Sequence, residues 1–568
     1  MKETVKHHLA FLYGEAAAPE LEERVEMLAR KSRQNRSSAV AAKKNELTEA
    51  DCMLITYGDQ VRSTGEPPLA TLTNFLSERV ARTISAVHIL PFYPSSSDDG
   101  FSVMDYYSID PALGTWDDID SLGRNFDMMF DAVFNHASAQ GVWFQKFLRQ
   151  EAGWESAFFT VSGEPDLSKV VRPRALPLLT EFETAAGRKR VWTTFSADQA
   201  DIDFSDPRML LRILEVLLFY VSKGARYIRL DAIAFLWKIP GTSCIHLEQT
   251  HRAIQLMRAV LDDAAPEVQL ITETNVPHSD NVSYFGDGSN EAQLVYNFAL
   301  PPLVFHTMRT GDATRLRRWA QALALPSERV TFFNFLASHD GIGLNPARGI
   351  LDPGEIDALV QTAIDHAGFV SYKNNPDGTK SPYELNISYF DALSSPTAGE
   401  SLHTQAARFL AAHSIVLALR GVPGIYFHSL FGSRGDRKGA EESGIPRRIN
   451  RKKLEVSALD AELDQADSLR AQVFAGMQGM LKARASHPAF NPFAEQEIPD
   501  APPDLFLITR KAANGTRVIC ATNVTSSDIS FPLPPDSSGW KSLTGSAESS
   551  GDKQVFLPSY GVAWFQNS

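Results

Sequence analysis

The sequence predicts an α/β protein built on a closed (β/α)8 barrel of the TIM type, with inserted subdomains and a C-terminal all-β domain. Short apolar runs alternate with amphipathic stretches, which is typical of a parallel sheet with crossover helices. Polar residues stand where several of these runs end. After about residue 488 the sequence changes to alternating apolar and polar residues. A doubly wound open sheet is the alternative, but no GxGxxG motif follows the first run.

Eight apolar runs are the expected barrel strands, and eight strands close such a barrel. In chain order they occupy residues 52–59, 86–92, 126–136, 225–232, 269–274, 294–299, 330–340 and 421–427. Between them, the segments 207–224 and 250–265 repeat apolar residues at helical spacing, so we expect crossover helices there.

Two intervals, after the third and the seventh runs, are too long for a plain crossover. We therefore divide residues 1–488 into a barrel, an inserted domain B at 137–205 and an inserted loop-rich domain B′ at 346–403. Residues 489–568 alternate apolar and polar side chains around an Asn-Gly turn, which predicts a small β domain.

The composition is that of an ordinary globular protein, with 43% hydrophobic and 22% charged residues in a chain of 568. The net charge of −13 argues against nucleic acid or membrane as a partner, so an anionic substrate needs a local cluster of cations. Cys52, Cys244 and Cys520 lie far apart without a metal-binding spacing, which favours a reducing, cytoplasmic location. No signal peptide and no apolar run of membrane-spanning length are evident.

The run 225–232 carries two charges, Arg229 and Asp231, inside an otherwise apolar strand. Residues two apart on a strand share a face, so both side chains point the same way. Burying them is costly unless they neutralise each other or serve a site. A structural ion pair and a functional site are both open on this strand alone.

Three other runs also end in polar residues, and in a barrel these ends meet at one rim. The groups are Asn135 with His136, Glu273, and His339 with Asp340. Three carboxylates converging with His, Arg and Asn can cleave a glycosidic bond with a nucleophile and a general acid/base.

Asp231 is the better nucleophile, because the adjacent Arg229 is expected to lower its pKa and keep it ionised. Glu273 has no cation beside it in the sequence, so its pKa can be raised for proton donation.

Four segments resemble the short conserved regions of the α-amylase superfamily (glycoside hydrolase family 13). They are DAVFNH (131–136), RLDA (229–232), TETN (272–275) and ASHD (337–340). The chain also resembles the sucrose phosphorylase branch of that family through SSDDGFSVMDY (96–106), VRPRALPLLT (171–180), VWTTFSADQADIDF (191–204) and RRINRKK (447–453).

This resemblance implies the roles of individual residues. Asp231 is the implied nucleophile, Glu273 the acid/base and Asp340 the transition-state stabiliser. The residues implied to hold or line the glucose site are Asp98, Phe101, His136, Phe195, Gln199, Arg229, His339 and Arg447. Arg174 matches the phosphate-contacting arginine of the branch, and Tyr383 matches the accompanying hydroxyl.

The branch also implies a retaining phosphorylase that makes α-glucose 1-phosphate, with inorganic phosphate as co-substrate and no metal or cofactor. In a chain of net charge −13, phosphate needs a dedicated cation, and a bidentate arginine such as Arg174 suits it. A hydrolase of the same fold and a non-catalytic amylase-like protein are the alternatives. The partners expected are small molecules, and the chain is expected to be a monomer or a homodimer.

The second substrate is the least determined part of the reaction. The segment SHDGIGLNPARGIL (338–351) is similar to that of glucosylglycerate phosphorylases, with sucrose 6′-phosphate, glucosylglycerol and sucrose as alternatives. Asn345 and Arg348 are candidate acceptor residues, because Arg348 can pair with a glycerate carboxylate. Arg348 can equally pair with Asp352 or Glu355 to brace its loop.

Overall fold

The computed structural model describes residues 2–35, 46–174, 176–375, 379–533, 540–544 and 554–567. At its centre is a closed barrel of eight parallel strands. The strands are β1 (Met53–Thr56), β3 (Ala86–Ile89), β4 (Asp127–Ala132), β10 (Ala225–Leu230), β11 (Gln269–Thr272), β12 (Leu294–Tyr296), β13 (Thr331–Asn334) and β17 (Val422–Tyr426). Each lies inside one of the eight predicted runs, so the predicted barrel is confirmed.

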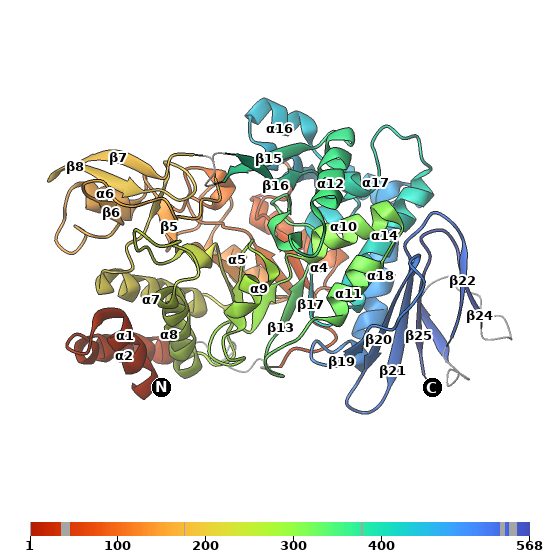
Figure 1. The fold of residues 1–568 in the computed structure, drawn as a ribbon, viewed down its shortest axis with the longest axis horizontal. Coiled ribbons are helices and arrows are strands. Elements are labelled where there is room, and N and C mark those ends of the chain that lie inside the picture. The colour runs from red at the N-terminus through yellow and green to blue at the C-terminus, as the bar shows by residue number, and fades with distance from the viewer. Residues whose placement is uncertain are drawn as a thin grey trace.

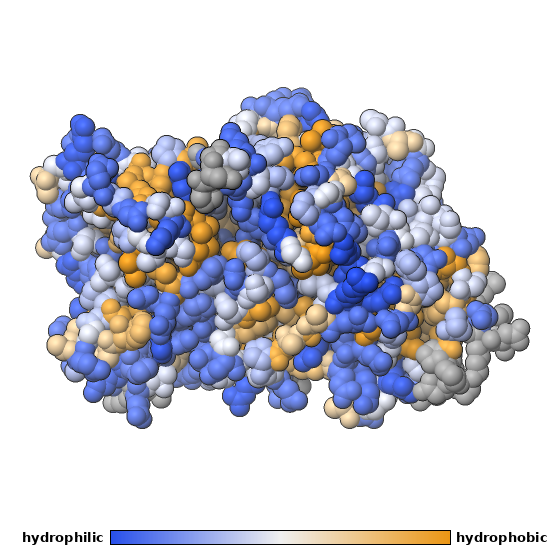
Figure 2. Space-filling model, viewed as in Figure 1, coloured by the Kyte–Doolittle hydropathy of each residue, from blue (hydrophilic) through white to orange (hydrophobic). Residues whose placement is uncertain are grey.

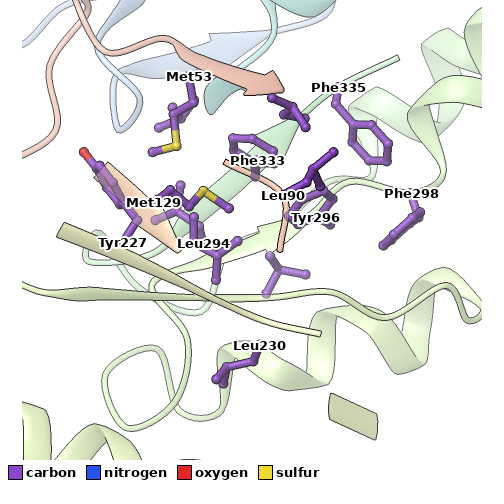
Figure 3. Packing of buried hydrophobic residues seen from close by; sticks show 14 of the residues in the cluster. Met53, Leu90, Met129, Tyr227, Leu230, Leu294, Tyr296, Phe298, Phe333 and Phe335 are labelled. Atoms are coloured by element: carbon purple, nitrogen blue, oxygen red, sulfur yellow. The ribbon is translucent and has the colours of Figure 1, made fainter. Parts of the chain in front are cut away.

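The barrel strands follow the order β1-β17-β13-β12-β11-β10-β4-β3, and β1 pairs with β3 to close the ring. Neighbouring strands are all parallel, for example Arg229 of β10 beside Asp131 of β4 and beside Ile271 of β11. Figure 3 shows the side chains of Met53, Met129, Tyr227, Leu294 and Phe333 gathered between these strands. The interior is therefore packed with side chains, and function is left to the strand ends.

Helices surround the barrel as crossovers (Figure 1). The main ones are α4 (Pro68–Arg79), α5 (Trp116–Leu122), α7 (Pro207–Ser222), α8 (Glu248–Ala264), α10 (Leu300–Thr310), α11 (Thr314–Gln321), α14 (Leu402–Ala418) and α18 (Leu469–Ala485). The two predicted helices correspond to α7 and α8, and Asp206 caps α7 by accepting from the Arg208 N–H. At the N-terminus, α1 (Lys2–Tyr13) packs on α8, and α2 (Ala18–Asn35) packs on α7 and α8.

The first long interval folds around two small sheets. One pairs β5 (His136–Ser138) with β9 (Gln199–Asp201), and the other has the order β6-β8-β7 (Thr160–Val161, Gly187–Trp192, Leu179–Thr184). Between these sheets lies α6 (Val142–Leu148). Domain B is predicted over this stretch, and its exact limits stay a prediction.

The second long interval contains α12 (Pro353–Asp365) and the hairpin of β15 (Phe369–Asn374) and β16 (Lys380–Asn386), joined by β14 (Ile342–Gly343). Helix α13 (Tyr389–Leu393) follows the hairpin. In Figure 1 the hairpin lies near α12 and α16 (Arg437–Ser443). The predicted limits of domain B′, 346–403, remain untested.

The chain ends in a β domain, as predicted. A five-stranded sheet has the order β19-β20-β21-β25-β23 (Glu495–Glu497, Leu505–Lys511, Arg517–Asn523, Val562–Gln566, Lys541–Thr544). A second sheet pairs β22 (Ile529–Pro532) with β24 (Gln554–Leu557), and a separate apolar cluster that includes Phe531 and Phe565 fills the space between the sheets. The first sheet shares the main core of the molecule, because Phe506 and Trp564 belong to it.

Hydrophilic residues predominate on the face shown in Figure 2, with hydrophobic residues in smaller groups. None of the helices in the described ranges has the length and apolar character needed to cross a membrane.

Candidate active site

A cavity of about 570 Å³ opens at the carboxyl ends of the barrel strands. Almost all of the predicted site residues line it: Asp98, Phe101, His136, Arg174, Phe195, Gln199, Asp231, Glu273, His339, Asp340, Asn345, Arg348, Tyr383 and Arg447. Arg229 is the exception among the predicted residues, because it is buried beneath the cavity floor and reaches it only through its contacts. The structure thus brings together residues that are hundreds of positions apart in the chain.

Arg229 is the central cation of the cavity floor. Its Nη1 donates to Oδ1 of Asp231 at 2.8 Å and makes a shorter contact with Asp131, while its Nη2 lies 3.8 Å from Oε2 of Glu273. The buried His88 lies on the other side of Asp131, with Nε2 2.6 Å from Oδ2. Arg229 therefore serves three carboxylates at once, and the Arg229–Asp231 pair lines a cavity as well as compensating charge.

Glu273 follows β11 and is held next to Asp231 by the backbone. Its Oε2 accepts a hydrogen bond from the N–H of Ala232 at 3.0 Å. Ala232 adopts a left-handed conformation with φ of +47°, which turns the chain directly after Asp231. Left-handed backbone disfavours bulky side chains, so the small alanine suits this position.

The pKa values of these carboxyl groups differ from the expected pattern at one residue. Burial raises the pKa of Glu273, as expected, although Arg229 opposes the rise. Burial also raises the pKa of Asp231, and Glu273, Asp131 and Asp340 add to it, while Arg229 acts in the opposite direction. The expectation of a lowered pKa for Asp231 is therefore wrong, because burial outweighs Arg229, whose charge also serves the neighbouring carboxylates.

Asp340 has the opposite electrostatic environment. Nη1 of Arg447 lies 2.6 Å from its Oδ1, and Arg451 approaches to 3.7 Å. Although burial raises the pKa of Asp340, Arg447, His339 and Arg451 together hold it well below its usual value. Arg447 is itself fixed by Glu384, whose two oxygens accept from its Nε at 2.9 Å and its Nη2 at 2.6 Å.

The predicted glucose-site residues form one connected wall. Nε2 of Gln199 lies 3.3 Å from Oδ2 of Asp98 and 3.2 Å from Nε2 of His136. Phe101 stacks on His339 with ring centroids 4.7 Å apart, which gives an apolar platform. Phe195 packs against His136 at 5.2 Å. Burial lowers the pKa of His136 and of His339, so both rings are neutral hydrogen-bonding groups near pH 7.

Asp98 is presented by a tight turn that the sequence encodes locally. Asp98 and Asp99 both have positive φ, and Gly100 has a φ of +114°. A Cβ at Gly100 would stand 2.6 Å from the carbonyl oxygen of Pro91, so only glycine fits. Asp99 anchors the turn through Nη1 of Arg451 at 2.6 Å and Nη2 of Arg448 at 2.8 Å.

Arg174 and Tyr383, the two predicted phosphate-binding residues, both line the cavity. Arg174 comes from the loop before β7, and Tyr383 comes from β16. Burial raises the pKa of Tyr383, and the charges of Arg174 and Arg447 oppose this rise, so Arg174 acts on the tyrosine hydroxyl. Tyr383 is therefore a neutral hydroxyl next to a cation, which suits an anionic oxygen.

Arg348 lies free of the carboxylates that were its alternative partners. Its Nη2 donates to the carbonyl of Pro382 at 3.0 Å, and its Nε lies 3.4 Å from Oδ1 of Asn345. The alternative that Asp352 or Glu355 pairs with Arg348 is wrong, because Arg315 binds both of those carboxylates. Arg348 keeps its charge available at the cavity.

Several site residues were missed by the sequence analysis. Asp131 is the first residue of the segment DAVFNH, and its position there gave no sign that it contacts Arg229. Glu384, 1% exposed, follows the predicted Tyr383 directly, and Lys373 lines the cavity from β15. Contacts between residues far apart in the chain leave no sequence pattern, so only proximity to known motifs could have indicated these three residues.

The comparisons with known proteins agree with this geometry. A model of the α-amylase catalytic domain matches residues 82–341. The chain is 53% identical over 498 residues to a glucosylglycerate phosphorylase of Allomeiothermus silvanus, covering 88% of each chain. It is 47% identical to that of Escherichia coli (85% and 86% covered) and 31% identical to a sucrose phosphorylase of Agrobacterium vitis (77% and 88% covered).

Solved structures show the same fold at low identity. The structure of sucrose 6F-phosphate phosphorylase from Thermoanaerobacter thermosaccharolyticum superposes with a TM-score of 0.73 at 24% identity, over 86% of this chain and 96% of that one. An α-amylase from H. orenii gives a TM-score of 0.69 at 15% identity, over 93% and 100%. With the barrel, the carboxylate cluster and close relatives in agreement, the chain belongs to the α-amylase family and, within it, to the sucrose phosphorylase branch that includes the glucosylglycerate phosphorylases.

Proposed function

We propose that the protein is a retaining phosphorylase that converts glucosylglycerate and phosphate into α-D-glucose 1-phosphate and D-glycerate. One observation carries the proposal: a single cavity joins a floor of three carboxylates, Asp231, Glu273 and Asp340, to a mouth lined by Arg174 and Arg348. The carboxylates suit glycosidic bond cleavage, and the cations suit two anionic partners. The 47–53% identity to proteins named glucosylglycerate phosphorylase supports the choice of acceptor.

In the first half of the reaction, Asp231 attacks the anomeric carbon of glucose. The bond from that carbon to the glycerate oxygen breaks, and Glu273 gives its proton to this oxygen. Arg229 favours this division of labour, because it hydrogen-bonds Asp231 at 2.8 Å but lies 3.8 Å from Glu273. The closer cation favours the Asp231 anion, which suits Asp231 as the nucleophile and Glu273 as the proton donor, although burial raises the pKa of both groups.

In the second half, a phosphate oxygen attacks the same carbon from the side that glycerate left. The carbon–Asp231 bond breaks, and the Glu273 carboxylate accepts the proton of the attacking phosphate hydroxyl. Two displacements at one carbon retain the α configuration. Asp340, held ionised by Arg447, faces the positive charge that develops on the sugar ring in both steps.

Arg174 and Tyr383 provide the phosphate site in this proposal. The guanidinium supplies a fork of donors and the tyrosine a hydroxyl, and both line the cavity together with Glu273. Arg348 and Asn345 are proposed to bind the carboxylate and a hydroxyl of glycerate. Glucosylglycerol or sucrose would offer no anion to Arg348, whereas sucrose 6′-phosphate would.

The location and assembly of the protein are further parts of the proposal. Cys52, Cys244 and Cys520 are buried free thiols, which supports a reducing, cytoplasmic compartment. Monomer and homodimer are both compatible with the chain described, and light scattering on the purified protein decides between them.

The experiment that tests the function runs the reaction in the synthesis direction. The purified enzyme is mixed with α-glucose 1-phosphate and, separately, D-glycerate, glycerol, fructose or fructose 6-phosphate, and phosphate release is measured. We expect D-glycerate to give the highest kcat/KM. A stronger reaction with fructose 6-phosphate or fructose would replace the acceptor, and release of free glucose without acceptor would indicate a hydrolase.

A further inference from the structure

The mouth of the cavity carries another cation, Lys373, to which the mechanism above gives no role. Lys373 lies in β15 and lines the same cavity as Arg174, Arg348 and the catalytic carboxylates. Its side chain is half-buried, and both burial and the charge of Arg348 lower its pKa. The two cations are therefore close enough to repel each other.

The β15–β16 hairpin fixes where Lys373 points. Lys373 pairs with Ser381 across the hairpin, and Ser381 is two residues from Tyr383 on β16. The register of the two strands shifts next to this pair, and Lys373 and Tyr383 both line the cavity. Arg348 is attached to the same hairpin through the carbonyl of Pro382 at 3.0 Å.

Within the described residues, Arg174, Arg348 and Lys373 form no ion pair with a carboxylate. Arg447, by contrast, is compensated by Asp340 and Glu384. Arg348 and Lys373 repel each other, and Lys373 is also half withdrawn from water, so their approach is a cost to the free protein. An anionic ligand at this position would remove that cost.

The double displacement brings two anions to one place in succession. Glycerate leaves from the face of the anomeric carbon that phosphate then attacks, so both occupy the space between Glu273 and the mouth of the cavity. Resting on the proposed function, we propose that Lys373 is a further specificity-determining residue, which with Arg348 binds the glycerate carboxylate and then the phosphate that replaces glycerate.

The geometry suits this dual use. Arg348 is held by Pro382 and Asn345, so it offers a fixed fork of donors to whichever anion is present. Lys373 is a point charge on a flexible stem, and it can follow the different positions of a carboxylate and a phosphate. A neutral acceptor leaves both charges uncompensated, which excludes glycerol and fructose as good acceptors.

The test compares Lys373→Met, which keeps most of the stem and removes the charge, with Lys373→Arg, which keeps the charge. Lys169→Met is the matched control at the exposed edge of the same cavity. For each variant we measure the KM for phosphate with glucosylglycerate, the KM for D-glycerate with glucose 1-phosphate, and the hydrolysis of α-glucosyl fluoride. The fluoride reaction needs neither anion, so it is the reference for folding and for glucosyl transfer.

We expect Lys373→Met to raise both KM values about ten-fold relative to the fluoride reference, because a charge-assisted hydrogen bond is lost at a half-exposed site. Lys373→Arg should restore most of both values, and Lys169→Met should change neither. A rise for one anion only, or for neither, overturns the shared site. A wild type that does not use D-glycerate refutes the proposed function instead, and the shared site falls with it.

Discussion

Replacing the acid/base Glu273 with alanine should separate the two halves of the mechanism. The carboxyl group is 8% exposed, accepts from the N–H of Ala232 at 3.0 Å and has a raised pKa. A raised pKa favours the protonated acid that the first step needs, and general acid catalysis contributes roughly 10²–10⁴-fold in rate. Glu273→Ala should lower kcat on glucosylglycerate by that factor, since an alkoxide is a poor leaving group.

Fluoride leaves without a proton, so α-glucosyl fluoride does not need Glu273 in the first step. With this donor and phosphate, Glu273→Ala should lose less than it does on glucosylglycerate, because only the base assistance to phosphate is missing. Turnover of both donors is followed through α-glucose 1-phosphate, with Glu273→Gln as the variant of matched shape. An equal loss on the fluoride and on glucosylglycerate would mean that Glu273 is not the proton donor.

The pH profile gives an independent check of the same residue. Since the pKa of Glu273 is raised, wild-type activity on the disaccharide should fall as pH rises through that value and Glu273 loses its proton. Activity should also fall as pH drops through the pKa of Asp231, which must be ionised to attack. With the fluoride, Glu273→Ala should lose the fall at high pH. Its fall at low pH should remain, because Asp231 must still be ionised to attack.

Three further substitutions test other parts of the site. Asp231→Asn should reduce turnover of every glucosyl donor by several orders of magnitude, because no covalent intermediate forms; a purified, folded variant with substantial activity would move the nucleophile elsewhere. Arg174→Ala should raise the KM for phosphate and the fraction of free glucose, measured by product analysis, and an unchanged phosphate dependence would place the phosphate site elsewhere. Asp131→Asn leaves Arg229 with one carboxylate fewer, so the thermal unfolding midpoint should fall, with about 3–5 kcal/mol lost as for a broken buried ion pair. An unchanged midpoint would show that Asp231 and Glu273 alone compensate Arg229.

The barrel could be predicted from the sequence because its strands are short, buried on both faces and separated by helices of regular period. The strand 225–230 is buried at every position, and all of its residues except Arg226 and Arg229 are apolar. The grouping of the polar residues at the strand ends could also be predicted, because a barrel places the carboxyl ends of all its strands at one rim. The choice of Asp231 as nucleophile and Glu273 as acid/base rests on carboxylates at such ends, whereas the stabiliser role of Asp340 rests on the family resemblance, and all three roles stay predictions.

The charge balance of the site could not be predicted, because it depends on distances between strands. Asp131 on the neighbouring strand also pairs with Arg229. The charge of Arg229, which was expected to lower the pKa of Asp231, is therefore shared between the two carboxylates. Arg315 takes both carboxylates that stood close to Arg348 in the sequence. Sequence spacing indicates which charged residues are close along the chain, whereas ion pairs form between residues that the fold brings close in space.

A phosphorylase must bring an anion to a carbon atom that is surrounded by carboxylates. In the intermediate, Asp340 and the deprotonated Glu273 are the anions near that carbon, so an approaching phosphate is repelled by the floor of the cavity. Water is not repelled, and it would win this competition unless the mouth of the cavity attracts the anion. In the proposed mechanism, Arg174, Arg348 and Lys373, which line the same cavity as Asp340, provide that attraction. The floor is what the chain shares with hydrolases of the same fold, so the residues that decide between phosphate and water must be sought at the mouth, in domains B and B′.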